Sequence, residues 1–118
     1  MRNIKILFLL VLLITLSCKK ESSHKPGNGW LKVTVRFNGI PSTGSIVYLS
    51  NSLNDLNNQV YVAHANTNNY GIADFGEVYK GTYTIGVTIP IQNSYDRKQN
   101  KQISIAEGEI TLESLDVN

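Results

Sequence analysis

The chain has 118 residues, of which 42% are hydrophobic and 17% charged, and its formal net charge is +2. Two of the 11 basic residues, Arg2 and Lys5, precede Cys18, so the rest of the chain carries nine basic residues against nine acidic ones. This balance leaves no basic stripe to neutralise phosphates, which argues against a nucleic acid as the partner. A single cysteine excludes an internal disulfide, so the fold must depend on apolar burial and strand pairing.

Residues 1–17 have the pattern of an export signal. Arg2 and Lys5 precede an apolar run from Ile6 to Leu16. As a helix this run would reach about 16 Å, roughly half of the hydrocarbon core of a bilayer. An apolar segment of this length after basic residues is typical of a signal peptide rather than of a permanent membrane span.

The end of this segment, Leu16-Ser17-Cys18, resembles the lipobox of bacterial lipoproteins, with Thr15 where that family usually has leucine. The resemblance implies that Cys18 becomes the first residue of the mature protein and carries acyl chains such as palmitate, which anchor it in the membrane. An ordinary signal peptide followed by a free thiol is the alternative. Lys19 takes the place of the aspartate that commonly retains lipoproteins at the inner membrane. The resemblance therefore implies an outer-membrane lipoprotein, facing either the periplasm or the cell surface.

Residues 18–29 form the expected linker between the anchor and the folded domain, 30–118. Lys19 to Gly29 mixes charged residues, serine, proline and glycine and has no apolar residue that could attach it to a core. Fully extended, these residues span at most about 35–40 Å, so the domain would stand clear of the lipid head-groups. We expect His24 to be solvated there.

The domain begins with two alternating stretches. Trp30 to Phe37 places apolar residues on one face and Lys32, Thr34 and Arg36 on the other, as in a half-buried strand. The turn Asn38-Gly39-Ile40-Pro41 follows. In the next strand Ser45, Val47 and Leu49 should face the core, which leaves Ile46 and Tyr48 on the outer surface.

Two segments in the middle of the chain are less regular. Ser50 to Asn58 is rich in asparagine and is expected to be a plain polar loop. It has no spaced run of oxygen ligands, so we predict no metal site. Gln59 to Ala65 is expected to be a third strand, whose buried face the sequence leaves open.

The stretch Thr67 to Val87 contains the strongest strand pattern. Tyr70 to Val78 is predicted to be a short strand, and Thr82 to Ile89 a long one that ends at Pro90. The alternation places four apolar side chains on the buried face of the long strand. The residues between them lie on its wet face: Thr82, Thr84, Gly86 and Thr88.

The last third of the domain is expected to begin with another polar loop, Gln92 to Asn100, and to continue with a strand from Gln102 to Ala106. The final strand, Ile110 to Val117, changes the phase of its apolar residues, which predicts a β-bulge near Glu113-Ser114. Seven strands with turns between them predict an all-β fold, a seven-stranded antiparallel Greek-key β-sandwich.

Two motifs carry a resemblance to known families. The pattern T-x3-G-x3-F-x2-V-x2-G-T-Y-x-I-x-V and the phrase V-x-F-N-G-I-P-S-T-G-S-I-V-Y-L resemble the carboxypeptidase regulatory-like and transthyretin-like (prealbumin-type) β-sandwich families. The resemblance covers nearly all of residues 30–118. It implies an accessory, non-catalytic role and gives almost no information about the ligand.

The candidate functional residues indicate contact rather than catalysis. His24 and His64 are the only histidines, and no serine lies in a nucleophile motif, so we expect neither an enzyme nor a cofactor. The favoured function is a structural or protein-interaction module at the cell envelope, acting through the loops 50–58 and 92–100. The alternative is a glycan-binding surface lipoprotein, with Trp30, Tyr48 and Tyr70 as weak candidates for stacking on sugars.

Overall fold

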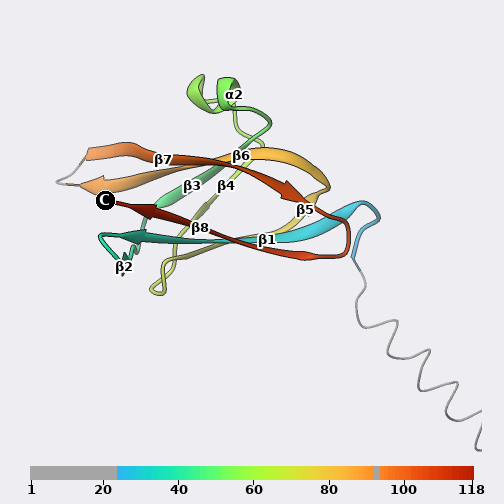
Figure 1. Ribbon diagram of the computed structural model, residues 1–118, viewed down its shortest axis with the longest axis horizontal. Helices are drawn as coiled ribbons and strands as arrows, with labels where there is room; N and C mark the ends of the chain where they lie inside the picture. Colours follow the sequence, from blue (N-terminus) through green and yellow to red (C-terminus); the bar gives the residue numbers. More distant parts are fainter. Residues whose placement is uncertain (1–23, 92–93) are drawn as a thin grey trace, which may run out of the picture.

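The computed structural model describes residues 24–91 and 94–118, with side chains for 24–90 and 99–118. Two four-stranded sheets pack face to face as a β-sandwich, with one short helix on the outside (Figure 1). Sheet A contains β1 (Asn28–Phe37), β2 (Ile40–Pro41), β5 (Ile72–Tyr79) and β8 (Ile110–Val117). Sheet B contains β3 (Ile46–Ser50), β4 (Ala63–Asn66), β6 (Gly81–Ile91) and β7 (Ser94–Ile105), and the helix is α2 (Leu53–Asn57).

The predicted all-β sandwich is confirmed, with eight strands rather than seven in the described part of the chain. Sheet B is antiparallel throughout, in the order β4-β3-β6-β7. In sheet A, β1 lies in the centre: β5 and β2 pair with it in antiparallel fashion, whereas β8 runs parallel to it. The parallel pair departs from the antiparallel expectation. The expected signal peptide, 1–17, and the lipidation site, Cys18, lie outside the described residues.

The core lies between the two sheets and follows the period of two in the sequence. Leu31, Val33 and Val35 of β1 are fully buried, as are Val47 and Leu49 of β3. The long strand β6 contributes its predicted apolar face, and Phe75 packs partly buried against the same cluster. Alternation in these strands therefore predicted the inner faces correctly.

The turn between β1 and β2 is the predicted one. Asn38 and Gly39 both have positive φ, 52° and 81°, and Phe37 pairs with Ile40 across them. Two consecutive residues with positive φ make a two-residue hairpin turn whose twist matches that of the flanking strands, which explains the Asn-Gly sequence.

The expected polar loop Ser50–Asn58 is wrong in part, because it contains α2. Ser52 begins the helix: its side-chain oxygen accepts a hydrogen bond from the backbone N–H of Asp55, at 3.1 Å. Leu56 is fully buried against the outer face of sheet B. Thr84 and Thr88, expected on a wet face, are only 7% and 9% exposed.

Three other boundaries were also predicted wrongly. The third strand is only Ala63–Asn66, and Val60 and Val62 before it are exposed. Residues 92–100 were expected to be a loop, but β7 begins at Ser94 and pairs along β6 as far as Ile91. Pro90 was expected to end β6 but lies within it. The strand β3 pairs with β6 only up to Thr88, so β3 needs no N–H from Pro90. Beyond that point β6 has a neighbour on one side, where a residue without an N–H is tolerated.

The predicted bulge in the last strand is wrong. β8 stays in register with β1 from Trp30 opposite Ile110 to Phe37 opposite Val117. The change of phase in the sequence instead places apolar side chains on the outer face, where Ile110 and Leu112 are 64% and 73% exposed.

The linker expected over residues 18–29 is shorter than predicted, because its last part is folded onto the sandwich. The backbone N–H of Lys25 donates to the Glu77 carboxylate, and that of Gly27 donates to the Glu107 carboxylate, both at 2.8 Å. Asn28 and Gly29 already belong to β1. The folded unit therefore includes residue 24 onward in the described part of the chain.

Replacing Ile85 in the centre of β6 tests the assignment of the core. Ile85 is fully buried, so Ile85→Ala should lower the free energy of unfolding by about 2–5 kcal/mol. Thr82→Ala in the same strand is the matched control: the side chain is exposed, and the change should cost less than about 1 kcal/mol. Urea denaturation measures both, and equal costs would contradict the assigned faces.

Tyr83 predicts a dependence of stability on alkaline pH. Burial, and to a smaller extent the neighbouring Tyr79, raise the pKa of the Tyr83 phenol above its ordinary value of 10.0, and the hydroxyl donates to the Tyr79 carbonyl at 2.7 Å. The folded state therefore holds this proton more tightly than the unfolded state. The resulting stabilisation is complete below pH 10 and is lost as the pH rises through the raised pKa.

Urea denaturation between pH 8 and pH 11 measures this effect. The free energy of unfolding should fall less steeply above pH 10 in Tyr83→Phe than in the unchanged protein, since the other tyrosines and the lysines titrate in both. Parallel curves for the two proteins would show that Tyr83 does not contribute.

Candidate binding surfaces

Clustered ionisable side chains are the first feature to look for in a catalytic or metal site. Within the described residues, no group of three or more His, Cys, Asp or Glu side chains lies together. No helix in the same part of the chain is long and apolar enough to cross a membrane. Among the described residues, one hollow on the outer face of each sheet is lined by side chains from different elements.

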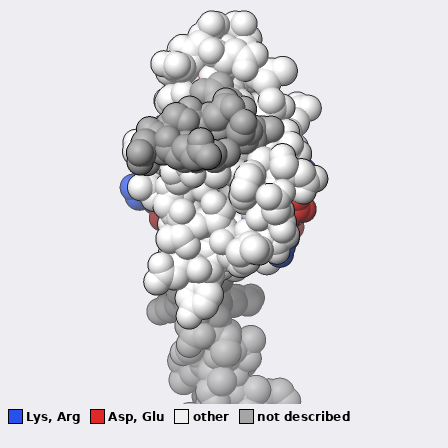
Figure 2. All heavy atoms as spheres, turned by 90° about the vertical axis from the view of Figure 1, so that its left-hand side faces the viewer, with Lys and Arg blue, Asp and Glu red and all other residues white. Residues whose placement is uncertain are grey.

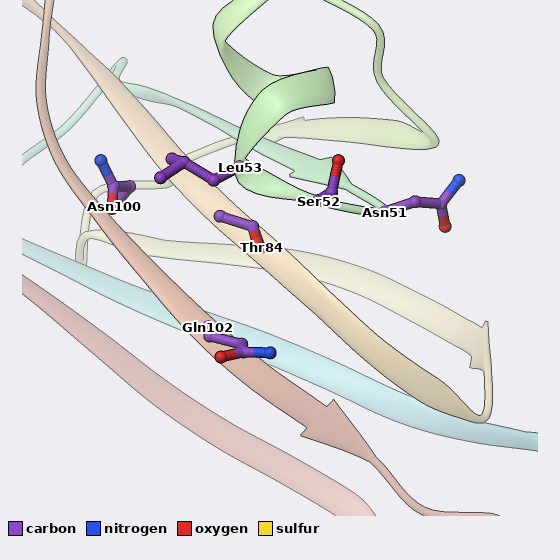
Figure 3. Close-up of a pocket in the computed structure, with 6 residues that line it drawn as sticks. All are labelled: Asn51, Ser52, Leu53, Thr84, Asn100 and Gln102. Carbon is purple, nitrogen blue, oxygen red and sulfur yellow. The ribbon is translucent and has the colours of Figure 1, made fainter.

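The hollow on sheet B lies between α2 and β7, above β6 (Figure 3). Its volume is about 290 Å³. We call it the amide hollow, and its lining residues are Asn51, Ser52, Leu53, Thr84, Asn100 and Gln102. The first three precede or begin α2, Thr84 comes from β6, and the last two come from β7.

The chemistry of the amide hollow is polar and uncharged. Three carboxamides and two hydroxyls line it, together with Leu53, which is 47% exposed. A carboxamide offers both donors and an acceptor, and a hydroxyl can do either. None of the lining residues is ionisable, so the hollow lacks the charged groups that usually hold phosphates or metal ions. Its groups match a neutral ligand that is rich in hydroxyls or amides.

The position of α2 creates this hollow and depends on Gly86. Gly86 lies in β6, opposite Tyr48 of β3 and Asn100 of β7. A Cβ atom at Gly86 would lie 2.8 Å from a terminal methyl group of Leu56, so the absence of a side chain allows the helix to approach the sheet. Leu56 then holds α2 on the sheet, and the segment that begins the helix forms one wall of the hollow.

The aromatic candidates do not come together. Tyr48 lies on the outer face of sheet B, where its ring stacks on that of Tyr61, with centroids 4.2 Å apart and an interplanar angle of 25°. The two rings are stacked on each other rather than side by side, so they do not form a flat two-ring platform for a sugar. Tyr70 is 75% exposed in the loop before β5, and Trp30 lies on the other sheet. His64 lies beside Tyr48, 6.3 Å between ring centroids.

Trp30 belongs to the second hollow, on the outer face of sheet A. In the sheet Trp30 lies between Glu77 of β5 and Ile110 of β8, and Lys32 lies between Asp74 and Leu112. The hollow has a volume of about 330 Å³. We call this surface the Trp30 face, made of Trp30, Lys32, Asp74, Gly76, Ile110 and Leu112.

Among the described residues, the end of the sandwich that carries the C-terminus shows little charge. Figure 2 looks at this end, and the described Lys, Arg, Asp and Glu atoms lie at its margins, with uncharged atoms between them. Arg36 and Asp116 form an exposed ion pair near the ends of β1 and β8, at 3.3 Å. Among the described atoms, this view shows no concentration of positive charge.

Sequence reasoning missed the amide hollow. Its residues come from two polar segments that were interpreted as loops, 50–58 and 92–100, and from Thr84 and Gln102 in strands. The hollow depends on strand pairing, since Thr84 pairs with Ser50 on one side and Gln102 on the other. Those pairings are not visible in the sequence itself.

No protein-family model matches the sequence, and no curated protein is significantly similar to it. Several solved structures share its fold. The TIE protein of Bacillus anthracis matches 77% of this chain with a TM-score of 0.59 and 22% sequence identity. BcpA, the major pilin subunit of Bacillus cereus, matches 79% with a TM-score of 0.56 and 15% identity. A protein of Pseudomonas aeruginosa, described as a candidate carbohydrate-binding protein, matches 85% with a TM-score of 0.55 and 13% identity.

The extent of these matches differs. This chain spans 16% of the Bacillus anthracis protein and 30% of the pilin subunit, but 95% of the Pseudomonas protein. Identities this low establish the shared fold and do not transfer a ligand. The chain is therefore a small, predominantly antiparallel β-sandwich. The finer resemblance to regulatory-like and transthyretin-like domains stays a prediction.

Proposed function

We propose that the protein is a non-catalytic, membrane-tethered β-sandwich that binds a partner at the cell envelope. The observation that carries this proposal is the amide hollow: three neutral amides and two hydroxyls converge on an outer face where no charged side chain joins them. Such groups can bind and orient a ligand, but none of them is a general base or nucleophile with a partner to activate it. The pilin subunit shows that this fold occurs in a structural protein.

The anchor in this proposal is Cys18. The apolar run that ends at Leu16 and the lipobox-like sequence before the cysteine support it. Several acyl chains on one residue would hold the protein firmly, since each buried methylene contributes about 0.8 kcal/mol. With Lys19 next to the cysteine, the outer membrane is the proposed location, and the domain faces the periplasm or the cell surface.

A second candidate function is the binding of a neutral glycan in the amide hollow. Side-chain amides pair well with adjacent sugar hydroxyls, and Leu53 offers an apolar surface for the C–H face of a ring. A candidate carbohydrate-binding protein has this fold over 95% of its length. The stacked pair of Tyr48 and Tyr61 adds little, because one ring covers the other. The protein-interaction proposal therefore stays first.

The lipid anchor predicts the behaviour of Cys18→Ala. The unchanged protein should be recovered in the membrane fraction and enter the detergent phase on phase separation. The variant should lose its acyl chains and move to the aqueous phase, and mass spectrometry of the N-terminal peptide measures the modification directly. A protein with an unmodified N-terminus that already partitions into water would contradict the anchor.

The amide hollow predicts where a ligand binds. The detergent-solubilised full-length protein is tested on an array of neutral glycans and, in parallel, by cross-linking to envelope proteins. The double variant Asn100→Ala and Gln102→Ala should weaken recognition at least tenfold, since both exposed side chains line the hollow. Asn69→Ala, an exposed amide in the loop before β5, is the matched control and should bind normally.

The two readouts separate the candidate functions. Glycan binding that is lost only in the hollow variant would favour the second candidate. Protein cross-links that are lost only in that variant would favour the first. If the hollow variant and the control behave like the unchanged protein in both assays, the hollow is not the binding site. Point substitutions are preferable to replacing loop 50–58, because that loop contains the buried Leu56.

A further inference from the structure

The segment between the proposed anchor and the sandwich is short. Residues 25–29 are folded onto the domain through the hydrogen bonds to Glu77 and Glu107. Only Lys19 to Ser23 separate Cys18 from His24, the first described residue. At the length of a fully extended chain, Cys18 and His24 are at most about 20 Å apart. The sandwich is therefore held much closer to the membrane than a free linker of eleven residues would hold it.

The chain enters the sandwich on the Trp30 face. The ring of His24 lies edge-on to that of Trp30, with centroids 5.2 Å apart and an interplanar angle of 65°. The Lys25 N–H bonds to Glu77, which is paired with Trp30 in the sheet. The short tether thus begins beside Trp30 itself. The Trp30 face is therefore the outer surface of the sandwich that lies next to the start of the tether.

The composition of the Trp30 face suits a lipid head-group layer. Ile110 and Leu112 are 64% and 73% exposed, on the strand beside Trp30. Tryptophan and exposed aliphatic residues favour the boundary between water and hydrocarbon. Lys32 and Asp74, paired across β1 and β5, together with the exposed Glu77 beside Trp30, give the face both signs of charge. A mixed charge around an apolar centre matches a largely zwitterionic surface better than a strongly anionic one.

We infer that the Trp30 face rests on the lipid head-groups of the membrane that holds Cys18. This inference rests on the proposed lipid anchor and goes beyond it, since an anchor alone does not orient the domain. The short tether keeps the face at a high effective concentration near the surface, so weak individual contacts suffice to orient the sandwich.

A second copy of the chain is a less suitable occupant. A stable dimer interface usually buries about 800 Å² on each partner. The Trp30 face offers three large apolar side chains, two of them on one edge strand, with a charged pair beside them. That apolar area is small for a lasting protein interface, whereas a tethered contact with lipid needs no such area.

The single tryptophan of the chain provides the test. The purified, lipidated, full-length protein is reconstituted into vesicles of phosphatidylethanolamine and phosphatidylglycerol, with or without lipids brominated near the head-group. Trp30 emission should be reduced at least twofold by the brominated lipids and should be protected from iodide in the water. The variant with Ile110→Ser and Leu112→Ser should stay in the vesicles and lose most of this quenching.

The controls distinguish the possible failures. Urea denaturation checks that the double serine variant is folded, as expected for two exposed positions. Wild-type protein that washes off the vesicles would refute the anchor itself. Anchored protein whose Trp30 is quenched by iodide but not by brominated lipid would overturn the inference and leave the anchor standing. Protection of Trp30 that grows with protein density at a fixed lipid composition would also overturn it, in favour of a second copy.

Discussion

The close backbone approach at Gly29 is the constraint on which sheet A depends. A Cβ atom there would lie 2.3 Å from the carbonyl oxygen of Ala106 and 2.8 Å from that of Glu109. Because glycine has none, the turn between β7 and β8 docks on the start of β1, where the Trp30 N–H donates to the Glu109 carbonyl at 2.9 Å. β8 must then run parallel to β1. The same register exposes Ile110 and turns Glu113 toward β7. The Glu113 carboxylate forms an ion pair with the Lys101 ammonium, 2.8 Å away, and this pair bridges the edges of the two sheets.

Alternation along the chain predicted the sandwich and most of its core. The inner faces of β1, β3 and β6 followed from a period of two, because each of these strands packs its apolar face against the opposite sheet. The bounds of β8 were also correct, Ile110 to Val117. Its register was not, since the predicted bulge assumed that every apolar residue must face inward. Exposed apolar residues are common on folded proteins, so that assumption fails at an outer face.

The two candidate binding surfaces could not be predicted, because each depends on contacts between distant parts of the chain. The amide hollow exists because Leu56 packs over Gly86, thirty residues later, a contact that alternation along β6 does not reveal. The Trp30 face requires the register of β8 against β1, which is set by a glycine that was placed in the linker. Polar composition was equally misleading in β7, an edge strand whose residues pair on one side only.

The two surfaces lie on opposite sides of the sandwich, which connects the two proposals. The Trp30 face is lined by residues of sheet A and the amide hollow mainly by residues of sheet B and the start of α2. Figure 1 shows the two sheets packed face to face. Packed sheets lie roughly 10 Å apart, so the outward side chains of one sheet cannot share a surface with those of the other. In the proposed orientation, with sheet A turned toward the lipid, sheet B and its hollow would face away from the membrane. A short tether at one face would thus present the opposite face to the proposed partner, whereas a long flexible linker would leave that face unoriented.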